Sequence, residues 1–474
     1  MFARVEIPVW ALALLVLFAT ITFASHFLFP SVRWFFRHRA EALVTRLNTR
    51  LARPIEPFKL ARRSDTIERL AHDPEVAHAI VEHARETGVP ESVAYETARR
   101  YAREIVPGFS ALLYFAVATR LARWLSRSLY RVRVSGEAEA LSAIQGDAPV
   151  VFVLNHRSNM DYVLVTWLTA RKTALAYAVG EWARRWPLGS LIRAMGGYFV
   201  RRRDLNPLYR RILARYVQIA TRNGVAQAVF PEGRLSRDGA LHPPKLGILS
   251  YILSGREAED VGDVIFVPVA VNYERVLEDR VLIGAADTGP NPFRLRWWMV
   301  LRYLLRHLQL RLMGRFTRFG YAAVAYGRPL SLRAFLLDDH ANPASALGHV
   351  LMDRIEAALP VLPMALVCEA LVGGITGRGE IAAHLHDRMT RWRDAGHPVH
   401  RGGRSADSIV AGALAMLEAR KLITQQGGNI AITESGLAVL RFYAATLPRI
   451  RKLENSDPSH DDPDSYLRPA GAIR

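Results

Sequence analysis

The stretch VVFVLNHRSNMDYVLV, residues 150–165, decides the fold. Its apolar and mostly β-branched residues up to Leu154 are typical of a buried strand. Ser158, followed three residues later by Asp161, is typical of a helix start with an acid in the first turn. The sequence therefore predicts a strand and then a helix, with His156 in the turn between them.

His156 and Asp161 are candidates for general base catalysis. A neutral imidazole is well matched to taking a proton from an alcohol near neutral pH, provided that a carboxylate fixes its tautomer. Asp161 lies one turn into the predicted helix and can reach back to the ring. The alternative is that Asp161 only caps the helix and that His156 bonds to the turn backbone, but capping does not explain a His and an Arg together at the mouth of a sheet.

Strand-like runs alternate with helical patterns between residues 131 and 328. The runs are RVRVSG (131–136), PVVFVLN (149–155), ALAYAVG (174–180), GGYFVRR (196–202), AQAVFPEG (226–233), VIFVPVAVN (264–272) and AAVAYGRP (322–329). This alternation predicts an α/β domain over residues 128–335, with a mostly parallel central sheet flanked by helices. In such sheets functional groups gather at the carboxyl ends of the strands.

The composition indicates a folded protein with an anionic partner. The chain has 474 residues, half of them apolar, and 63 Lys and Arg against 44 Asp and Glu give a net charge of +19. Such an excess favours nucleic acid, an acidic membrane surface or a phosphorylated substrate as partner. The single cysteine, Cys368, excludes an intramolecular disulfide framework and a cysteine metal site, and its apolar neighbours predict a core position.

Residues 1–32 are predicted to form a transmembrane anchor. No Asp, Glu, Lys or Arg occurs from Ile7 to Val32, and this stretch is long enough as a helix to cross about 30 Å of hydrocarbon. A cleaved signal peptide is disfavoured, since the start is not basic and the apolar stretch is long. Five arginines follow the span within residues 33–50 and only Arg4 precedes it, so we expect the catalytic domain on the cytoplasmic face.

The remaining segments are predicted to be mainly helical. Residues 33–127 form a membrane-proximal region with two amphipathic segments separated by Gly-Val-Pro. The basic, Trp-containing stretch 294–316 is either a solvated helix or a helix resting on anionic lipid. Residues 336–452 form a helical C-terminal region with a winged-helix-like order of helix, hairpin and helix, but without the basic helix that DNA binding needs. The polar tail, 453–474, is predicted to be disordered.

Two further basic clusters follow predicted strands. Arg201, Arg202 and Arg203 follow GGYFV, and their guanidinium groups could grip a phosphate bidentately. The second cluster follows AQAVF and comprises Glu232, Gly233, Arg234, Ser236 and Arg237. The alternative for either cluster is a solvated surface patch.

These stretches, taken in order, resemble the four sequence blocks of the glycerophospholipid acyltransferases, and most closely the glycerol-3-phosphate acyltransferase branch. NHRSNMDY is similar to the first block, and GGYFVRRR followed by LYRRIL is similar to the second. EGRLSRDG with the downstream PPKLG resembles the third, and VPVAVNYERV resembles the fourth. In the third block Leu235 stands where the family usually has Arg, so the role of that Arg would pass to Arg234 or Arg237.

The resemblance implies transfer of an acyl group from acyl-CoA or acyl-carrier protein to the sn-1 hydroxyl of glycerol 3-phosphate, giving lysophosphatidate. His156 is implied as the base and Asp161 as its partner, with no metal and no cofactor. Glu232 would bond to the free hydroxyl of the acceptor or lock the arginines in place. The other residues implied in substrate binding are Arg157, Ser158, Arg201, Arg202, Gly233, Arg234, Ser236, Arg237 and Lys245.

Other functions remain as alternatives. Lysophosphatidate or dihydroxyacetone phosphate would serve as acceptor with the same His156 and Asp161. A membrane-tethered nucleic-acid-binding regulator would use the net charge and the winged-helix-like segment, but it leaves both residues unexplained, so we expect anionic membrane lipid and no nucleic acid as partner. The chain has neither the Gly-x-Ser-x-Gly of serine hydrolases nor a Gly-rich loop ending in Gly-Lys-Ser or Gly-Lys-Thr.

Overall fold

The structure is a computed structural model, and it describes most of the chain between residues 44 and 449. The described residues are 8, 10, 16, 42, 44–142, 144, 148–170, 172–180, 188–201, 205–255, 262–287, 309, 313, 318–400, 402–426 and 429–449. The predicted anchor (1–32), the basic stretch 294–316 and the predicted tail (453–474) lie almost wholly outside them. Within the described residues, no helix combines the length and the apolar character needed to cross a bilayer.

The chain divides into two compact units. One comprises Met1–Ile55 with Arg171–Thr173, and in it the backbone N–H of Arg53 donates to the carbonyl of Lys172 at 2.9 Å. The other comprises Glu56–Ala170 with Ala174–Arg474 and contains all the sheets. The candidate site lies in this second unit.

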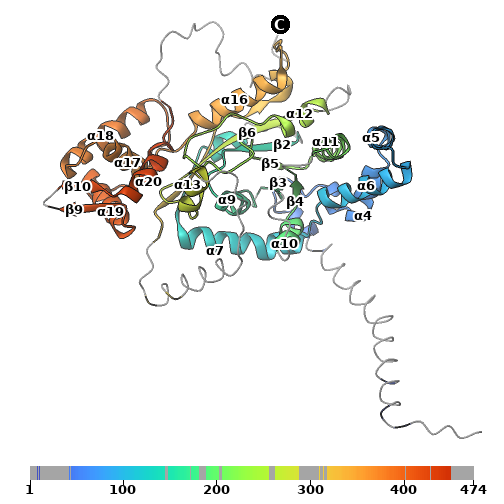
Figure 1. The fold of residues 1–474 in the computed structure, drawn as a ribbon, viewed down its shortest axis with the longest axis horizontal. Coiled ribbons are helices and arrows are strands. Elements are labelled where there is room, and N and C mark those ends of the chain that lie inside the picture. The colour runs from blue at the N-terminus through green and yellow to red at the C-terminus, as the bar shows by residue number, and fades with distance from the viewer. Residues whose placement is uncertain are drawn as a thin grey trace, which may run out of the picture. The chain divides into compact units, whose positions relative to one another are not determined.

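A large sheet forms the centre of the second unit (Figure 1). Its strands are β1 (Arg131–Ser135), β2 (Val150–Leu154), β3 (Ala176–Gly180), β4 (Gly197–Val200), β5 (Gln227–Val229), β6 (Ile265–Tyr273), β7 (Tyr321–Tyr326) and β8 (Leu330–Ser331). They stand in the order β1-β7-β6-β2-β5-β3-β4, with β8 also paired to β6. The five strands β6, β2, β5, β3 and β4 run parallel, so their carboxyl ends share one edge, whereas β7 and β8 run antiparallel to β6.

Both faces of the sheet are covered, which explains why every residue of β2 is buried. Val150, Phe152 and Leu154 point into one apolar cluster, which includes α9 (Met160–Thr169). Val151 and Val153 alternate with them and point into the other cluster, with α11 (Pro207–Arg222), α12 (Gly247–Ser254) and α16 (Pro343–Ala357). Figure 1 shows α16 and α9 on opposite sides of the sheet. Each such side chain stabilises the fold by about 1.5–3 kcal/mol through burial.

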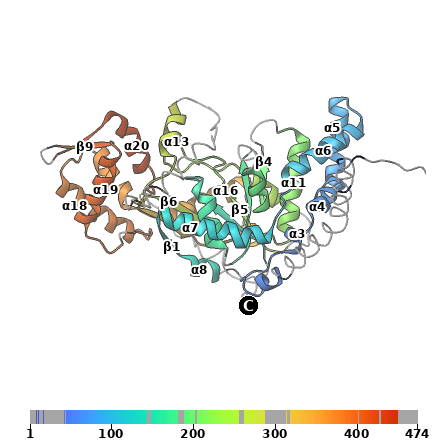
Figure 2. The same ribbon diagram turned by 90° about the horizontal axis from the view of Figure 1, so that it is seen from below.

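Short helices precede the sheet and fill its connections. Before β1 the chain forms α3 (Pro57–Leu60), α4 (Arg63–Ala71), α5 (Pro74–Thr87), α6 (Glu91–Ile105), the π-helical turn η2 (Leu113–Ala118) and α7 (Thr119–Leu129). Between strands lie α8 (Glu137–Ser142), α10 (Leu188–Ala194) and α13 (Asp279–Asp287), and α15 (Leu332–Phe335) follows β8. Asp73 caps α5 by accepting from the N–H of Glu75, and Gly88 ends it at φ 68°, so the predicted pair of helices separated by Gly-Val-Pro is confirmed. Figure 2 shows α7 from below.

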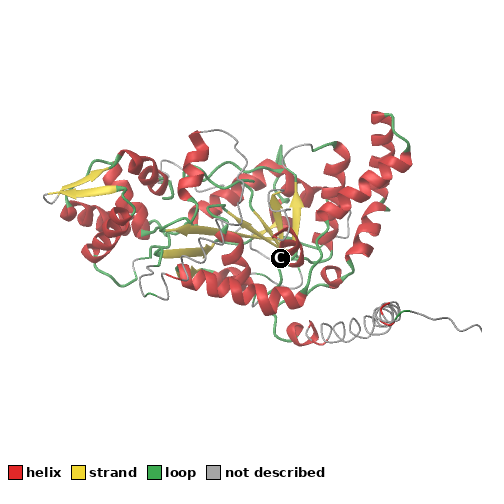
Figure 3. Cartoon of the chain, turned by 60° about the horizontal axis from the view of Figure 1, so that its bottom comes forward, coloured by secondary structure: helices red, strands yellow, loops and turns green. Residues whose placement is uncertain are grey.

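The C-terminal region is helical with one small hairpin, as predicted. It consists of α17 (Pro363–Val372), α18 (Arg378–Asp394), α19 (Ala406–Ala419), β9 (Ile423–Gln426), β10 (Asn429–Ile432) and α20 (Glu434–Ala444). The antiparallel hairpin stands apart from the large sheet (Figure 3). Apolar residues of α17 and α20 belong to the same cluster as Val150 and Phe152, and the Asn272 amide of β6 donates to the carbonyls of Pro360 and Thr446 at 3.0 and 3.4 Å. The C-terminal region and one face of the sheet therefore share one core.

The α/β class and the mostly parallel sheet are confirmed. All seven predicted runs contain a strand, from β1 to β7, and β8 was not predicted because Leu330 and Ser331 are too short a run to show a period. The predicted domain boundaries at 127/128 and 335/336 stay predictions. The shared core shows that the chain after 335 completes the packing of the sheet rather than standing beside it.

Candidate active site

The turn after β2, residues 155–159, is held rigidly against β6. We call it the first-block loop. The Asn155 side chain donates to the carbonyl of Val271 at 2.9 Å and accepts from the N–H of the same residue at 2.7 Å. A side-chain amide thus continues the pairing of β2 with β6 where the strand itself ends, and it fixes the start of the loop that carries His156.

Asp161 gathers four hydrogen bonds from the first-block loop and from β6. Its Oδ2 lies 2.9 Å from Nδ1 of His156 and accepts the backbone N–H groups of Arg157 and Ser158 at 2.8 and 3.0 Å. Its Oδ1 accepts the hydroxyl of Tyr273 at 2.7 Å. Asp161 is fully buried, so these donors replace its water shell. The predicted pairing of His156 with Asp161 is therefore present, together with the capping alternative.

The His156 ring is fixed in a defined orientation. Because the Asp161 carboxylate can only accept, Nδ1 carries the ring proton and Nε2 keeps its lone pair. Phe230 packs over the ring with centroids 4.2 Å apart, and Tyr162 meets it edge-on at 5.4 Å. Nε2 has no hydrogen-bond partner in the described part of the chain, and it is not among the fully buried, unpaired polar atoms there. Nε2 is thus the atom that can meet a substrate.

The segment after β5, residues 230–246, is tied to the same loop, and we call it the third-block loop. Glu232 accepts the backbone N–H of His156 at 2.9 Å and that of His242 at 3.2 Å, while the N–H of Ser236 donates to the carbonyl of His156 at 3.0 Å. Burial raises the pKa of the Glu232 carboxyl, and the charge of Arg157 opposes this shift. The predicted roles of Glu232 were a bond to the acceptor hydroxyl or the locking of the arginines, whereas these hydrogen bonds join its carboxylate to the backbone of both loops.

Arg157 is buried beside His156 rather than exposed to a substrate phosphate. Its side chain donates to the carbonyl of Gly239 in the third-block loop. Burial lowers the pKa of its guanidinium, and the charges of Glu232 and Asp161 offset this shift only in part. Its Nε and one terminal nitrogen have no hydrogen-bond partner in the described residues. This placement differs from the predicted phosphate contact, because the loop turns this side chain inward beneath the third-block loop.

Two predicted serines are also buried and engaged. Ser158 donates to Glu278 at 3.0 Å and accepts the N–H of Met160 at 3.1 Å. Ser236 donates to the carbonyl of Ala240 at 2.9 Å and accepts the N–H of Gly239, so it shapes the turn. Both placements differ from predicted direct contact with substrate, since spacing in a sequence marks a loop but not which side chains turn inward.

Cationic side chains remain at the surface of the third-block loop. Arg234 is exposed and has no hydrogen bond or ion pair to a described residue, and Lys245 runs across Gly233, whose φ is +67°. Arg237 donates to the carbonyl of Ala285 at 2.9 Å and is half-buried. Leu235, at the position where the family usually has Arg, packs against the apolar core. The loop therefore presents Arg234 and Lys245 outward, on a segment bound to His156 at two points.

Arg201 lies away from this group. It follows β4, which stands three strand spacings from β2, or about 14 Å. Its guanidinium makes a two-pronged pair with Glu104 of α6 at 2.7 and 2.8 Å, between the rings of Tyr101 and Tyr209. The Glu104 carboxylate raises the pKa of Arg201. The structure thus does not bring Arg201 together with His156, and Arg202 lies outside the described residues.

Two residues at this site were not assigned a role from sequence. Tyr273 ends β6 and holds Asp161, and Glu278 accepts the N–H of Asn159 at 2.6 Å besides the hydroxyl of Ser158. Burial raises the pKa of both groups. Their positions could have indicated a role, because Tyr273 is the last residue of β6 and Glu278 follows it. β6 is parallel to β2, so both strands end at the same edge of the sheet.

Cys368 is a core residue, as predicted. It is fully buried, and burial raises the pKa of its thiol to about 12, so it is not a nucleophile near neutral pH. In the described residues no three His, Cys, Asp or Glu side chains converge as metal ligands.

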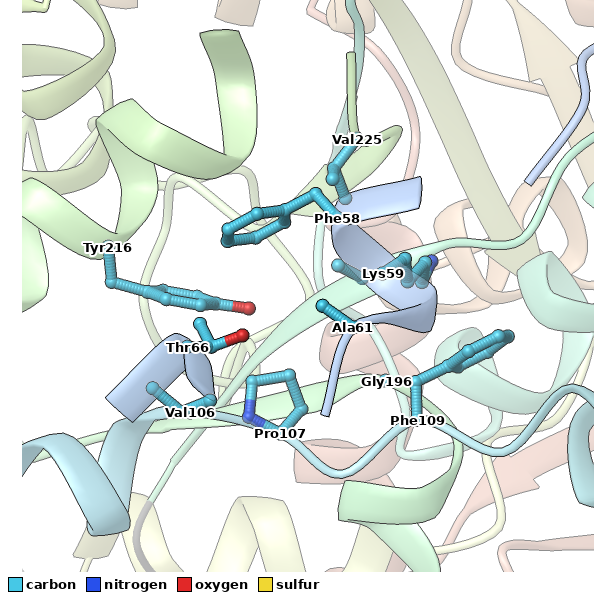
Figure 4. Close-up of a pocket in the computed structure, with 11 residues that line it drawn as sticks. Phe58, Lys59, Ala61, Thr66, Val106, Pro107, Phe109, Gly196, Tyr216 and Val225 are labelled. Atoms are coloured by element: carbon cyan, nitrogen blue, oxygen red, sulfur yellow. The ribbon is translucent and has the colours of Figure 1, made fainter. Parts of the chain in front are cut away.

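An apolar pocket lies at the opposite edge of the sheet (Figure 4). Lys59 of α3 enters it, donates to the carbonyl of Ala174 at 2.6 Å and lies 4.9 Å from the centroid of Phe109. Phe58 and Tyr216 form the other side. The cavity of about 20 Å³ has room for about one water, so this pocket is a packing feature and not a substrate site.

Two family models match this chain, and one solved structure aligns with part of it. A family model described as Acyltransferase matches residues 131–272, which contain the first-block and third-block loops. A second, described as Glycerol-3-phosphate acyltransferase C-terminal region, matches residues 299–444. The structure of the 1-acyl-sn-glycerophosphate (LPA) acyltransferase PlsC from Thermotoga maritima aligns at 20% identity over 55% of this chain and 81% of that one, with a TM-score of 0.32.

The chain is also similar to curated proteins. The glycerol-3-phosphate acyltransferase of Pseudomonas putida (strain W619) is 28% identical over 335 residues, or 66% of this chain and 39% of that protein. The protein of the same name from Aeromonas hydrophila is 28% identical over 365 residues, or 72% of this chain and 44% of that protein. The chain thus spans less than half the length of these relatives. The chain is thus similar to acyltransferases over residues 131–272, which contain His156 and Asp161, and to the C-terminal region of glycerol-3-phosphate acyltransferases over residues 299–444.

Proposed function

We propose that this protein transfers a fatty acyl group from an acyl thioester to the sn-1 hydroxyl of glycerol 3-phosphate, giving lysophosphatidate. One observation carries the proposal: Asp161 fixes Nδ1 of His156, so that Nε2 keeps a free lone pair at the carboxyl edge of the sheet. The matches to glycerol-3-phosphate acyltransferases support this choice of acceptor.

The reaction follows from the tautomer of His156. Nε2 takes the proton of the acceptor hydroxyl as its oxygen attacks the thioester carbonyl, and the imidazolium that forms is stabilised by Asp161. When the tetrahedral intermediate collapses, the carbon–sulfur bond breaks and Nε2 returns the proton to the leaving thiolate. The products are an ester and a free thiol, and no further reactant is needed. General base catalysis of this kind contributes about two to four powers of ten in rate.

The acceptor phosphate is held by the outward cations of the third-block loop. Arg234 and Lys245 are both exposed there, and Glu232 and Ser236 fix this loop to the backbone of His156. Arg201, which is bound to Glu104, would contribute only if its second terminal nitrogen reached the ligand.

The substrates and the surroundings of the enzyme follow from the same proposal. The donor is acyl-CoA or acyl-carrier protein, and neither a metal nor a cofactor takes part. Residues 1–32 anchor the chain, the catalytic unit faces the cytoplasm, and anionic lipid attracts the net charge of +19. A tether of this kind would release lysophosphatidate into the leaflet where it is made.

The proposal is tested by acyl transfer from labelled palmitoyl-CoA in isolated membranes, offering glycerol 3-phosphate, dihydroxyacetone phosphate and lysophosphatidate separately. We expect lysophosphatidate from glycerol 3-phosphate, and a loss of about 10²- to 10⁴-fold in kcat for His156→Ala in protein that is still folded at the assay temperature. The control is His349→Ala, at an exposed histidine of α16. Turnover of another acceptor alone would keep the mechanism and change the acceptor. Full activity of His156→Ala would remove the basis of the proposal.

A regulator that binds nucleic acid is less well supported. The winged-helix-like order of α19, β9, β10 and α20 is present, but α20 packs its apolar side into the core with α17. Binding to duplex DNA that weakens steeply with salt would favour this alternative.

A further inference from the structure

A second groove lies beside the catalytic site, at the carboxyl end of β6. It has a volume of about 440 Å³, within the range of small-molecule sites. Two segments line it: residues 275–281, which follow β6, and residues 419–421, which follow α19 in the C-terminal region. The C-terminal region thus contributes directly to a cavity at the edge of the sheet that carries His156.

The groove is lined by several basic side chains, and its two carboxyl groups accept hydrogen bonds from neighbouring residues. Asp279 is buried and accepts from Arg420 and from the hydroxyl of Tyr443, both at 2.5 Å. Glu278 is bound to the amide of Asn159 at 2.6 Å, and burial raises the pKa of its carboxyl. The lining nevertheless holds four basic side chains, Arg275, Arg280, Arg420 and Lys421, against these two carboxyl groups.

Three basic side chains are not paired with a described carboxylate. Arg280 is exposed and donates to the backbone carbonyl of Arg420 at 2.9 Å, which leaves its charge uncompensated. Arg275 lies 4.2 Å from the ring centroid of Phe319. Lys421 is exposed and has no hydrogen bond from its amine to a described residue. Uncompensated cations around a concave surface favour an anionic ligand.

The backbone of Lys421 closes the end of α19 in a left-handed conformation. Its φ is 58°, in the left-handed region, and of the residues that the structure describes it is the one non-glycine there. It follows α19 at the position where glycine is usual. The N–H of Lys421 donates to the carbonyl of Glu418, and the N–H of Leu422 donates to the carbonyl of Leu417. A lysine costs about 1 kcal/mol more than glycine in this conformation. This helix end places Lys421 on the lining of the groove, where the residue is exposed.

The groove is joined to the catalytic residues by a short chain of contacts. Glu278 lines the groove and accepts the hydroxyl of Ser158, whose own N–H donates to Asp161, the partner of His156. A ligand in the groove therefore lies near the reacting atoms but not on them. This arrangement fits a substrate whose charged end is separated from its reactive end.

We propose that this groove binds the phosphate-rich nucleotide end of a coenzyme A thioester, with the pantetheine arm extending from it toward His156. The inference rests on the proposed function, because it assigns a place to the donor of that reaction. The concave shape favours a small polyanion over the flat contact of a carrier protein. The acceptor phosphate has its own cations, Arg234 and Lys245, on the third-block loop.

The test measures binding of coenzyme A and of dephospho-coenzyme A, which lacks the 3′-phosphate, to the full chain by calorimetry. The variant is Arg280→Ala/Lys421→Gln, which removes two exposed charges from the groove. The matched control is Arg378→Ala/Arg393→Gln, which removes two exposed charges from α18. Arg420 is not substituted, because its loss would leave Asp279 buried without a charged partner.

We expect Kd for coenzyme A to rise about tenfold in the groove variant and to stay unchanged in the control. The preference of the wild-type protein for coenzyme A over dephospho-coenzyme A should shrink in the groove variant as well. KM for glycerol 3-phosphate should stay within about twofold, since its site is elsewhere.

Three outcomes would overturn the inference. The first is an unchanged Kd for coenzyme A in the groove variant. The second is a rise in KM for glycerol 3-phosphate alone, which would make the groove the acceptor site. The third is an effect confined to acyl-carrier protein as donor, which would make it a docking surface for that protein. Binding is measured without turnover, so groove-dependent binding of coenzyme A in a protein that does not acylate glycerol 3-phosphate would reject the proposed function and keep this inference.

Discussion

Tyr273 donates its hydroxyl to Oδ1 of Asp161 across 2.7 Å, from a position 112 residues further along the chain. Burial and the Asp161 charge hold the pKa of this phenol well above its usual value of 10, so it stays a donor wherever the enzyme works. The pair joins the end of β6 to the start of α9, and it places the Asp161 carboxylate by tertiary structure as well as by helix capping.

Tyr273→Phe is expected to lower kcat about tenfold with little change in KM. The variant removes one of four donors to Asp161, and a charge-assisted hydrogen bond of this kind is worth about 1.5–3 kcal/mol. Steady-state kinetics with both substrates varied would measure this. The control is Tyr95→Phe on α6, whose hydroxyl bonds to exposed His72. An unchanged kcat would show that three donors suffice to hold Asp161.

Glu232→Gln is expected to lower kcat and thermal stability together while leaving KM for glycerol 3-phosphate unchanged. The amide can accept only one of the two backbone N–H groups, from His156 or His242, that the carboxylate accepts now. Kinetics and a melting curve on the same preparation separate the possibilities. A raised KM at unchanged stability would show instead that Glu232 touches the acceptor.

Arg234→Ala and Arg201→Ala are expected to have different effects. Arg234 is exposed, so its loss should raise KM for glycerol 3-phosphate about tenfold without affecting stability. Loss of Arg201 leaves Glu104 buried without its partner and should cost about 2–3 kcal/mol of stability. Arg201→Gln combined with Glu104→Gln should recover much of that loss. If it recovers nothing, or if Arg201→Ala changes only KM, the assignment of Arg201 to the scaffold is wrong.

The sequence predicts those parts of the site that are local along the chain, and it does not predict those that depend on contacts between distant residues. Period and capping located β2, α9 and the His156–Asp161 pair, because both are local along the chain. The inward turn of Arg157 and the pairing of Arg201 with Glu104 could not be found this way. Glu104 lies 97 residues before Arg201, and only the packing of α6 beside β4 brings them together. Distant partners such as Tyr273 and Asp161 likewise need the strand order, which periodicity does not supply.

Gly239→Ala is expected to destabilise the protein by at least about 2 kcal/mol. Gly239 has φ +87°, and a Cβ there would collide with the backbone carbonyl of Phe442 on α20. The movement would also shift the carbonyl that Arg157 uses, so activity should fall. Thermal unfolding is the measurement, with Gly379→Ala as control, because a Cβ at that position meets nothing within 4 Å. Equal stability of the two variants would contradict the close approach of α20.

Lys59→Met is expected to remove a rise in stability with alkaline pH. Burial lowers the pKa of Lys59 from 10.5 to about 7, and the charge of Glu56 opposes this only in part. Between pH 7 and 10.5 the unfolded chain therefore binds a proton that the folded chain does not, so the free energy of unfolding increases with pH across this window. Melting temperatures at pH 7, 8 and 9 would show the increase in the wild-type protein and a flatter profile in the variant. Identical profiles would mean that Lys59 stays protonated when folded.

The core that one face of the sheet shares with α17 and α20 also has a consequence for biosynthesis. The cluster that contains Val151 and Val153 has all its helices once α16 has been synthesised. The cluster that contains Val150 and Phe152 has all its helices only after α20 has been synthesised. At about 5–20 residues per second, a ribosome needs several seconds to make the intervening chain. Throughout this interval the nascent protein carries, next to the first-block loop, an apolar surface that α17 and α20 do not yet cover. We therefore expect chaperones to engage it late in translation, and a stop codon shortly after residue 335 to yield an aggregating fragment rather than a smaller enzyme.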